Sequence, residues 1–121
     1  MELNTLDVGT EKVAEVVADS MVIGSVRDAL DLLATAQYQE DATCVMILEK
    51  NLPAEFFDLK TGLAGEILQK YTTYRMKLVI IGDFAVVQSK SLQAFIRESN
   101  RGKQVAFVTT REEALRHIAG W

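Results

Sequence analysis

The sequence predicts a single α/β domain whose sheet is mostly parallel and begins with an antiparallel hairpin. The first observation is a set of three short, unbroken apolar runs at residues 44–48, 78–81 and 105–108, a pattern typical of central strands that are covered on both faces. The second is that apolar residues at helical spacing follow each run. Strands that alternate with helices indicate right-handed crossovers, which pack the helices against a parallel sheet.

The hairpin is expected at the start of the chain. Residues 2–8 and 11–18 read as extended segments, and the Gly-Thr pair between them suits a tight turn. Ser25 then has the position of a helix N-cap, and apolar residues recur at helical spacing from there to residue 37. The expected order over residues 1–121 is therefore β-β-α-β-α-β-α-β-α, in one domain.

Three further helices are predicted from apolar stripes and capping residues. Ser89 has the N-cap position of one helix, and Gly102 follows the end of that helix. Thr110 and Glu113 form a capping-box pattern before the last helix. The apolar stripes of the three helices are Leu63, Ala64, Ile67, Leu68 and Tyr71; Leu92, Phe95 and Ile96; and Ala114, Leu115 and Ile118.

Composition and charge indicate an ordinary globular domain of the cytoplasm. The chain has one cysteine, which excludes an internal disulfide, and no apolar stretch of the roughly 20 residues that a membrane helix requires. Residues 1–60 hold twelve acidic and four basic side chains, whereas residues 61–121 hold five acidic and nine basic ones. This asymmetry indicates either a mixed, solvated surface or a surface that attracts anions or an acidic partner. Because no basic stripe with interleaved aromatic residues occurs, we do not expect a nucleic acid as partner. The lack of a spanning apolar stretch likewise gives no reason to expect a membrane.

The sequence shows no motif for metal, cofactor or covalent chemistry. His117 is the only histidine, and with no second histidine and one distant cysteine to join it, we expect no metal site. Cys44 lies inside an apolar run, where a free cysteine behaves as a small hydrophobic residue. Gly62 and Gly65 match neither the Walker pattern nor the dinucleotide-binding fingerprint. We therefore expect no cofactor and, on balance, a protein that is not an enzyme.

Polar residues collect where the predicted parallel strands end. Glu49, Asp83 and Thr110 follow the three apolar runs, while Thr61 and Gly62 stand at the start of a predicted helix. Open α/β sheets bind ligands at this edge, where strand carboxyl ends and helix N-termini meet. A small, anionic ligand at this edge is therefore one alternative function. An enzyme with Glu49 or Asp83 as general base comes third. The simpler roles are an Asx-type turn for Asp83 and a helix cap for Thr61.

Four stretches carry a resemblance to a known family. They are ALDL at 29–32, FFDLKTGLAGEILQK at 56–70, IIGDF at 80–84 and SKSL at 89–92. At these stretches the chain resembles a bacterial family of domains of unknown function, DUF4180. The resemblance extends over most of the chain and implies no activity.

A broader resemblance rests on FDLKTGL, from Phe57 to Leu63. This stretch is similar to a motif of STAS domains, the anti-sigma-factor antagonist fold, whose element order also begins with a hairpin. A serine before the glycine of that motif is the regulatory phosphorylation site of STAS domains. The resemblance therefore implies phosphorylation of Thr61, although this chain has one more residue between Asp58 and Thr61.

We therefore expect a regulatory or protein-interaction module that binds a protein partner or a second copy of itself. Gly62 and Gly65 each cost roughly 1 kcal/mol of helix propensity against alanine, which suggests that another molecule or strand approaches them closely. A shallow apolar patch at this edge would favour a protein partner, and a deep pocket would favour a small molecule. The hypothetical binding residues are Asp58, Thr61, Gly62, Gly65, Asp83 and Thr110.

Overall fold

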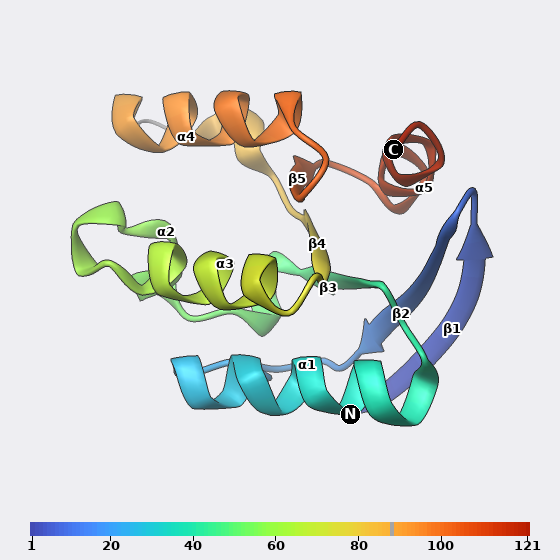
Figure 1. Ribbon diagram of the computed structural model, residues 1–121. Coiled ribbons are helices and arrows are strands. Elements are labelled where there is room, and N and C mark those ends of the chain that lie inside the picture. The colour runs from blue at the N-terminus through green and yellow to red at the C-terminus, as the bar shows by residue number, and fades with distance from the viewer. Residues whose placement is uncertain (88) are drawn as a thin grey trace.

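The computed structural model describes residues 1–87 and 89–121 and shows one five-stranded sheet with helices on both faces (Figure 1). The strands lie side by side in chain order; β1 and β2 are antiparallel, and the other neighbouring pairs are parallel. The strands are β1 (Glu2–Val8), β2 (Glu11–Val17), β3 (Cys44–Leu48), β4 (Lys77–Ile81) and β5 (Val105–Val108). The helices are α1 (Val26–Glu40), α2 (Ala54–Phe57), α3 (Leu63–Thr73), α4 (Lys90–Arg101) and α5 (Arg111–Ala119). Short 3₁₀ turns are η1 (Glu49–Asn51), η2 (Leu59–Thr61) and η3 (Phe84–Val86).

The predicted α/β class, the mostly parallel sheet and the N-terminal hairpin are confirmed. Each predicted strand and each of the four predicted helices is present; most bounds agree within one or two residues, while α1 extends three residues beyond the predicted stripe, to Glu40. The short helix α2 and the three 3₁₀ turns were not predicted. They are three or four residues long, too short for an apolar period to show in the sequence.

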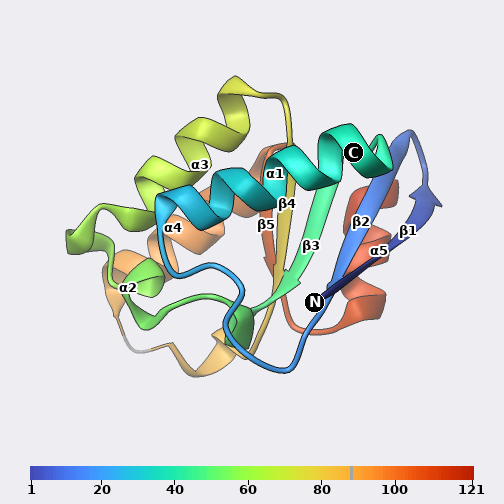
Figure 2. The same ribbon diagram turned by 90° about the horizontal axis from the view of Figure 1, so that it is seen from below.

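Each face of the sheet has its own apolar core, because successive side chains of a strand point to opposite faces. Val45 and Ile47 of β3 belong to the larger core, which α1, α3 and α4 cover. Cys44 and Met46 belong to a smaller core under α5. Figure 2 shows α5 on the far side of the sheet from α1 and α3. None of the helices in the described ranges combines the length and apolarity needed to traverse a membrane.

Three helices begin at the capping residues that the sequence predicted. The hydroxyls of Ser25, Ser89 and Thr110 accept backbone N–H groups three residues further on, at 3.1, 3.2 and 3.1 Å. The Glu113 carboxylate accepts the N–H of Thr109 at 3.0 Å. In a standard capping box it would accept the N–H of the N-cap, Thr110, so the bond here is one residue earlier in the chain. These bonds satisfy N–H groups that a helix start otherwise leaves unpaired.

A buried amide fixes the loop between β2 and α1 against the end of β3. The Asn51 side chain is fully buried and donates from Nδ2 to the carbonyls of Ala18 and Ser20, at 3.0 and 2.8 Å. Its Oδ1 accepts the N–H of Leu48 at 3.1 Å. A buried amide with three bonds is a satisfied polar group that specifies one arrangement of these segments.

Candidate functional site

The edge at the carboxyl ends of the parallel strands is built from two turn segments that lie next to each other. The first runs through α2 and η2 to the start of α3, and the second contains η3. The rings of Phe57 and Phe84 bring the two together, with centroids 5.9 Å apart. Because Phe57 precedes Asp58 and Phe84 follows Asp83, two of the predicted site residues lie on adjacent segments. We call this region the edge surface, formed by Phe57, Asp58, Leu59, Thr61, Gly62, Asp83, Phe84 and Val86.

A chain of aromatic contacts supports the edge surface from below. All five phenylalanines of the protein take part. Phe107 of β5 lies 5.3 Å from Phe84 and 5.8 Å from Phe95 of α4, and Phe56 lies 5.0 Å from Phe57. Edge-to-face aromatic pairs of this kind add stability beyond the area that they bury. The segment 56–57 is therefore anchored in the core.

Glu49 and Asp83 are brought together, as parallel strands require. Glu49 Oε1 accepts the backbone N–H of Asp83 at 3.3 Å. The Glu49 carboxylate therefore serves as an acceptor that joins the ends of β3 and β4. In the described residues, the Asp83 carboxylate caps no N–H group of η3. The prediction of an Asx-type turn at Asp83 is therefore wrong: in the described chain its side chain forms no cap, and its own N–H binds Glu49 instead.

Thr61 lies one residue before the helix cap. Gly62 is the N-cap of α3, and its φ of 79° places it in the left-handed region, which favours glycine. The Thr61 hydroxyl lies 2.7 Å from the Glu55 carbonyl and 2.8 Å from the Asp58 carbonyl, to which it donates. It also accepts the Leu63 N–H at 3.2 Å. The predicted cap at Thr61 is therefore wrong by one residue, although its hydroxyl still binds the first helical N–H.

Gly62 and Gly65 differ in whether the backbone conformation calls for a glycine. Gly62 needs its positive φ, whereas Gly65 is helical. A β-carbon on either residue would have no neighbour within 4 Å beyond the atoms next to it in the chain or helix. The described part of the chain thus gives no packing reason for Gly65, and its outer side faces open space.

Asp58 and Thr110 complete the predicted set and lie in different surroundings. Asp58 is exposed, and its carboxylate lies 3.9 Å from Lys60 Nζ. Thr110 begins α5, which covers the opposite face of the sheet. Arg111 fixes this helix start through a two-pronged ion pair with Glu15 of β2, at 2.6 and 3.1 Å. We therefore leave Thr110 out of the edge surface.

The cavities that we find in the described residues lie away from the edge surface. One of about 160 Å³ lies along α1 beside Met1, and one of about 340 Å³ lies between α1 and Tyr74. A third, of about 320 Å³, lies between the C-terminal ends of α4 and α5. None of the three is lined by a predicted site residue. In residues 1–87 and 89–121, no three His, Cys, Asp or Glu side chains are grouped to hold a metal ion.

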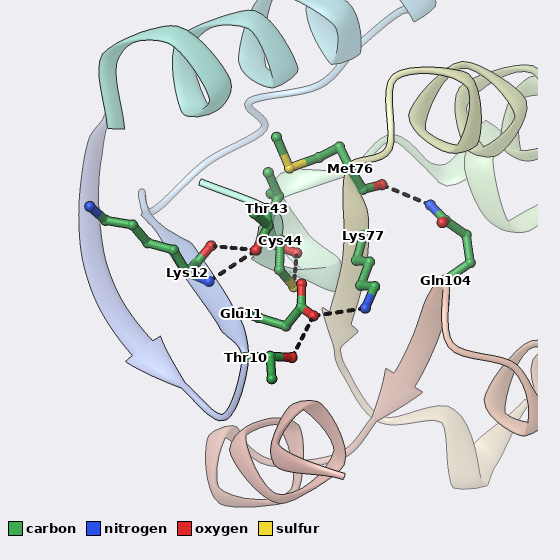
Figure 3. A network of polar contacts seen from close by, with 9 residues as sticks. Thr10, Glu11, Lys12, Thr43, Cys44, Met76, Lys77 and Gln104 are labelled. Atoms are coloured by element: carbon green, nitrogen blue, oxygen red, sulfur yellow. Dashed lines mark hydrogen bonds and ion pairs between the residues drawn. The ribbon is translucent and has the colours of Figure 1, made fainter. Parts of the chain in front are cut away.

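A second polar cluster, which the sequence reasoning missed, lies at the opposite edge of the sheet (Figure 3). The Glu11 carboxylate is only 8% exposed and accepts from Lys77 Nζ at 2.8 Å and from the Thr10 hydroxyl at 3.2 Å. Thr43 binds the backbone of Lys12 nearby at 2.9 Å. A signal was present, because Glu11 shares a strand face with the buried Val13 and therefore requires a partner.

The cluster sets the protonation of two groups. Burial acts to raise the pKa of Glu11, but hydrogen bonds from Lys77 and the neighbouring hydroxyls, with the charge of Lys77, leave it lowered. Burial, and then the charge of Glu11, raise the pKa of the Cys44 thiol to about 12. Cys44 is therefore a protonated core residue at neutral pH, in line with the sequence prediction.

Comparison with known proteins gives one family. The family model described as "Domain of unknown function (DUF4180)" matches residues 8–118. Searches of curated proteins and of solved structures found no match to this chain. The matched range includes β2 to β5, both turn segments of the edge surface and most of α5. The chain therefore belongs to the DUF4180 family of domains of unknown function.

Proposed function

We propose that this chain is a non-catalytic protein-interaction module of STAS-like architecture, which binds a protein partner through the edge surface. The element order, with a hairpin first and then alternating strands and helices, supports the STAS-like assignment. The observation that carries the binding proposal is Val86, whose side chain is 68% exposed on η3. It adjoins the partly buried Phe84, whose ring contacts Phe57.

The edge surface has the features of a protein contact. Phe57, Leu59 and Phe84 are half-buried and pack on the larger core, so their outer atoms are held in fixed positions. Apolar atoms held rigidly on a shallow surface, with acidic residues such as Asp58 and Asp83 around them, resemble the core and rim of an interface. The three cavities described above lie elsewhere, so they give no support to a small molecule at this surface.

The first turn of α3 supports the same surface. Gly65 weakens the helix by roughly 1 kcal/mol relative to alanine, and its own chain does not need the space. A partner whose backbone or side chain packs directly on this turn does need it. The open space at Gly65 therefore supports the proposed contact.

Phosphorylation of Thr61 is proposed as the regulatory step. A phosphate ester cannot donate the hydrogen that the hydroxyl now shares between Glu55 O and Asp58 O. It would add about two negative charges beside these carbonyls and the Asp58 carboxylate. The modification therefore loosens the α2–η2 turn and changes the edge surface.

The test compares exposed valines that lie on different parts of the molecule. Val86→Asp and Gly65→Ala should each abolish capture of one and the same partner by the purified chain. Val17→Asp, at a valine that is 44% exposed at the end of β2, should leave that capture unchanged. Equal loss with Val17→Asp, or no loss with Val86→Asp, would overturn the proposal.

The same variants examine self-association. If the pure chain forms a dimer in sedimentation experiments and Val86→Asp makes it monomeric, the partner is a second copy.

Thr61→Asp and Thr61→Val test whether phosphorylation of Thr61 regulates binding. If Thr61→Asp weakens capture and Thr61→Val, which lacks the charge, does so much less, the added charge acts as proposed. Equal effects would show that Thr61 matters only for the turn.

A further inference from the structure

A basic groove lies at the edge of the sheet opposite the edge surface. Its volume is about 320 Å³, and it is bounded by the C-terminal ends of α4 and α5 on the two sides of β5 (Figure 1). Arg101, Lys103, Arg116 and His117 line it. The other lining residues, all within the described chain, are Asn100, Gly102, Gly120 and Trp121, so no acidic side chain faces the groove.

Backbone hydrogen bonds already satisfy part of the carbonyls at the two helix ends that border the groove. Carbonyls at a helix C-terminus attract positive side chains when they have no partner. Here the N–H of Gly102 binds Ser99 O at 3.1 Å, and the N–H of Gly120 binds Arg116 O at 3.2 Å. Backbone N–H groups therefore satisfy one carbonyl at the end of α4 and several at the end of α5.

Carboxylates do not neutralise most of the groove either. Arg101 forms an ion pair with Glu98 at 3.4 Å, and both side chains are largely exposed, so this pair is weak. In the described residues, Lys103 and Arg116 have no carboxylate within 4 Å. The side chains of Lys103 and Arg116 thus line the groove without being held in an ion pair with any described residue.

Trp121 adds a further donor that lacks an acceptor. Its ring lies edge-on to His117 at 5.5 Å and under Lys77 Nζ at 5.3 Å. The indole Nε1 is buried, and no atom of the described residues accepts its hydrogen. Buried donors are nearly always bonded in native proteins, so an indole N–H without a protein acceptor in the described chain is unusual beside this groove.

We propose that the groove binds the phosphate group of a small phosphorylated molecule. Guanidinium forks match phosphate oxygens in pairs, and lysine supplies a further point charge. Arg116, Arg101 and Lys103 provide that set on a surface whose other side chains include no competing carboxylate. These three residues belong to residues 61–121, where basic side chains outnumber acidic ones. Binding of a phosphate group would give that excess of positive charge a function.

The test uses Trp121, the only tryptophan, as an internal reporter. Pyrophosphate, inorganic phosphate and sulfate are titrated at constant ionic strength, and indole fluorescence and the indole N–H resonance are followed. We expect saturable changes, with pyrophosphate binding several-fold more tightly than sulfate. Arg116→Gln should weaken pyrophosphate about tenfold, since it removes a charged hydrogen bond. The matched control Arg97→Gln, at an exposed arginine of α4 outside the groove, should leave the affinity unchanged.

Lys103→Gln provides a second variant at an exposed position, where substitutions usually change stability little. It should weaken pyrophosphate in the same direction as Arg116→Gln. Three outcomes would overturn the proposal: a response that is linear and equal for all three anions, equal losses for Arg116→Gln and Arg97→Gln, or a short RNA that binds these residues more tightly than pyrophosphate does.

Discussion

The Glu49 side chain lies directly against the backbone of Gly82, and the two leave no room for a β-carbon between them. A methyl group on residue 82 would come within 2.5 Å of Glu49 Oε1 and 2.7 Å of Glu49 Cβ. The same carboxylate oxygen accepts the N–H of Asp83. Glycine at position 82 therefore allows Glu49, the residue after β3, to form a hydrogen bond at the end of β4.

Gly82→Ala should lower the free energy of unfolding by about 1–3 kcal/mol, because the new methyl forces Glu49 away and breaks its bond to Asp83. Chemical denaturation measures the change. Gly102→Ala is the matched control, since the nearest atom to its added methyl is 3.7 Å away. A loss at Gly102 as large as that at Gly82 would contradict this account.

Alanine at Gly62 and at Gly65 should have opposite effects on stability. Gly62→Ala forces a β-carbon into the left-handed region and should cost about 1–2 kcal/mol. Gly65→Ala adds a methyl in open space on a helix and should stabilise the protein by up to about 1 kcal/mol. Thermal unfolding of the two variants beside the parent chain shows whether each substitution raises or lowers stability. If Gly65→Ala lowers it, the chain itself needs this glycine.

Glu11→Gln should destabilise the protein in a pH-dependent way. The folded-state pKa of Glu11 is lowered below 4.5, so its contribution is fully present above that value and is lost as the pH falls through the lowered pKa. The variant should lose about 1–3 kcal/mol at pH 7, and the difference should shrink on acidification below about pH 4.5.

Unfolding free energies measured from pH 7 to pH 3 give this difference directly. Glu2→Gln, at an exposed residue of β1, serves as control and should change stability by less than about 0.5 kcal/mol. A constant difference between Glu11→Gln and the parent across this range would show that the ion pair with Lys77 does not set the pKa of Glu11.

Cys44 should resist thiol reagents in the folded protein. With a pKa of about 12 and complete burial, almost no thiolate is present or accessible at pH 8. Reaction with a disulfide reagent should therefore follow unfolding, rising at least a hundredfold in denaturant. Fast labelling of the native chain would mean that the smaller core opens locally.

The elements that could be predicted from the sequence are those with local signals. Unbroken apolar runs located β3 and β5 to the residue, and short hydroxyl side chains located three helix starts. The Asn51 and Glu11 contacts join residues 31 to 66 positions apart, so no spacing in the sequence announces them. At the site, Glu49 and Asp83 lie close together, as expected from the ends of parallel strands. The sequence did not predict that the Glu49 carboxylate would accept the backbone N–H of Asp83, because that bond depends on the geometry of the turn.

The path of α5 has a consequence for how the domain is made. Because strand order equals chain order, each strand can join the growing sheet as it leaves the ribosome. Helix α5 instead returns across the other face, and Ala119 comes to lie against Gly9 at the β1–β2 turn. Until α5 has been synthesised, the apolar face around Val13, Met46 and Val79 remains uncovered. All five strands precede α5 in the chain, so the last helix is the element that completes the second core and removes this apolar face from water.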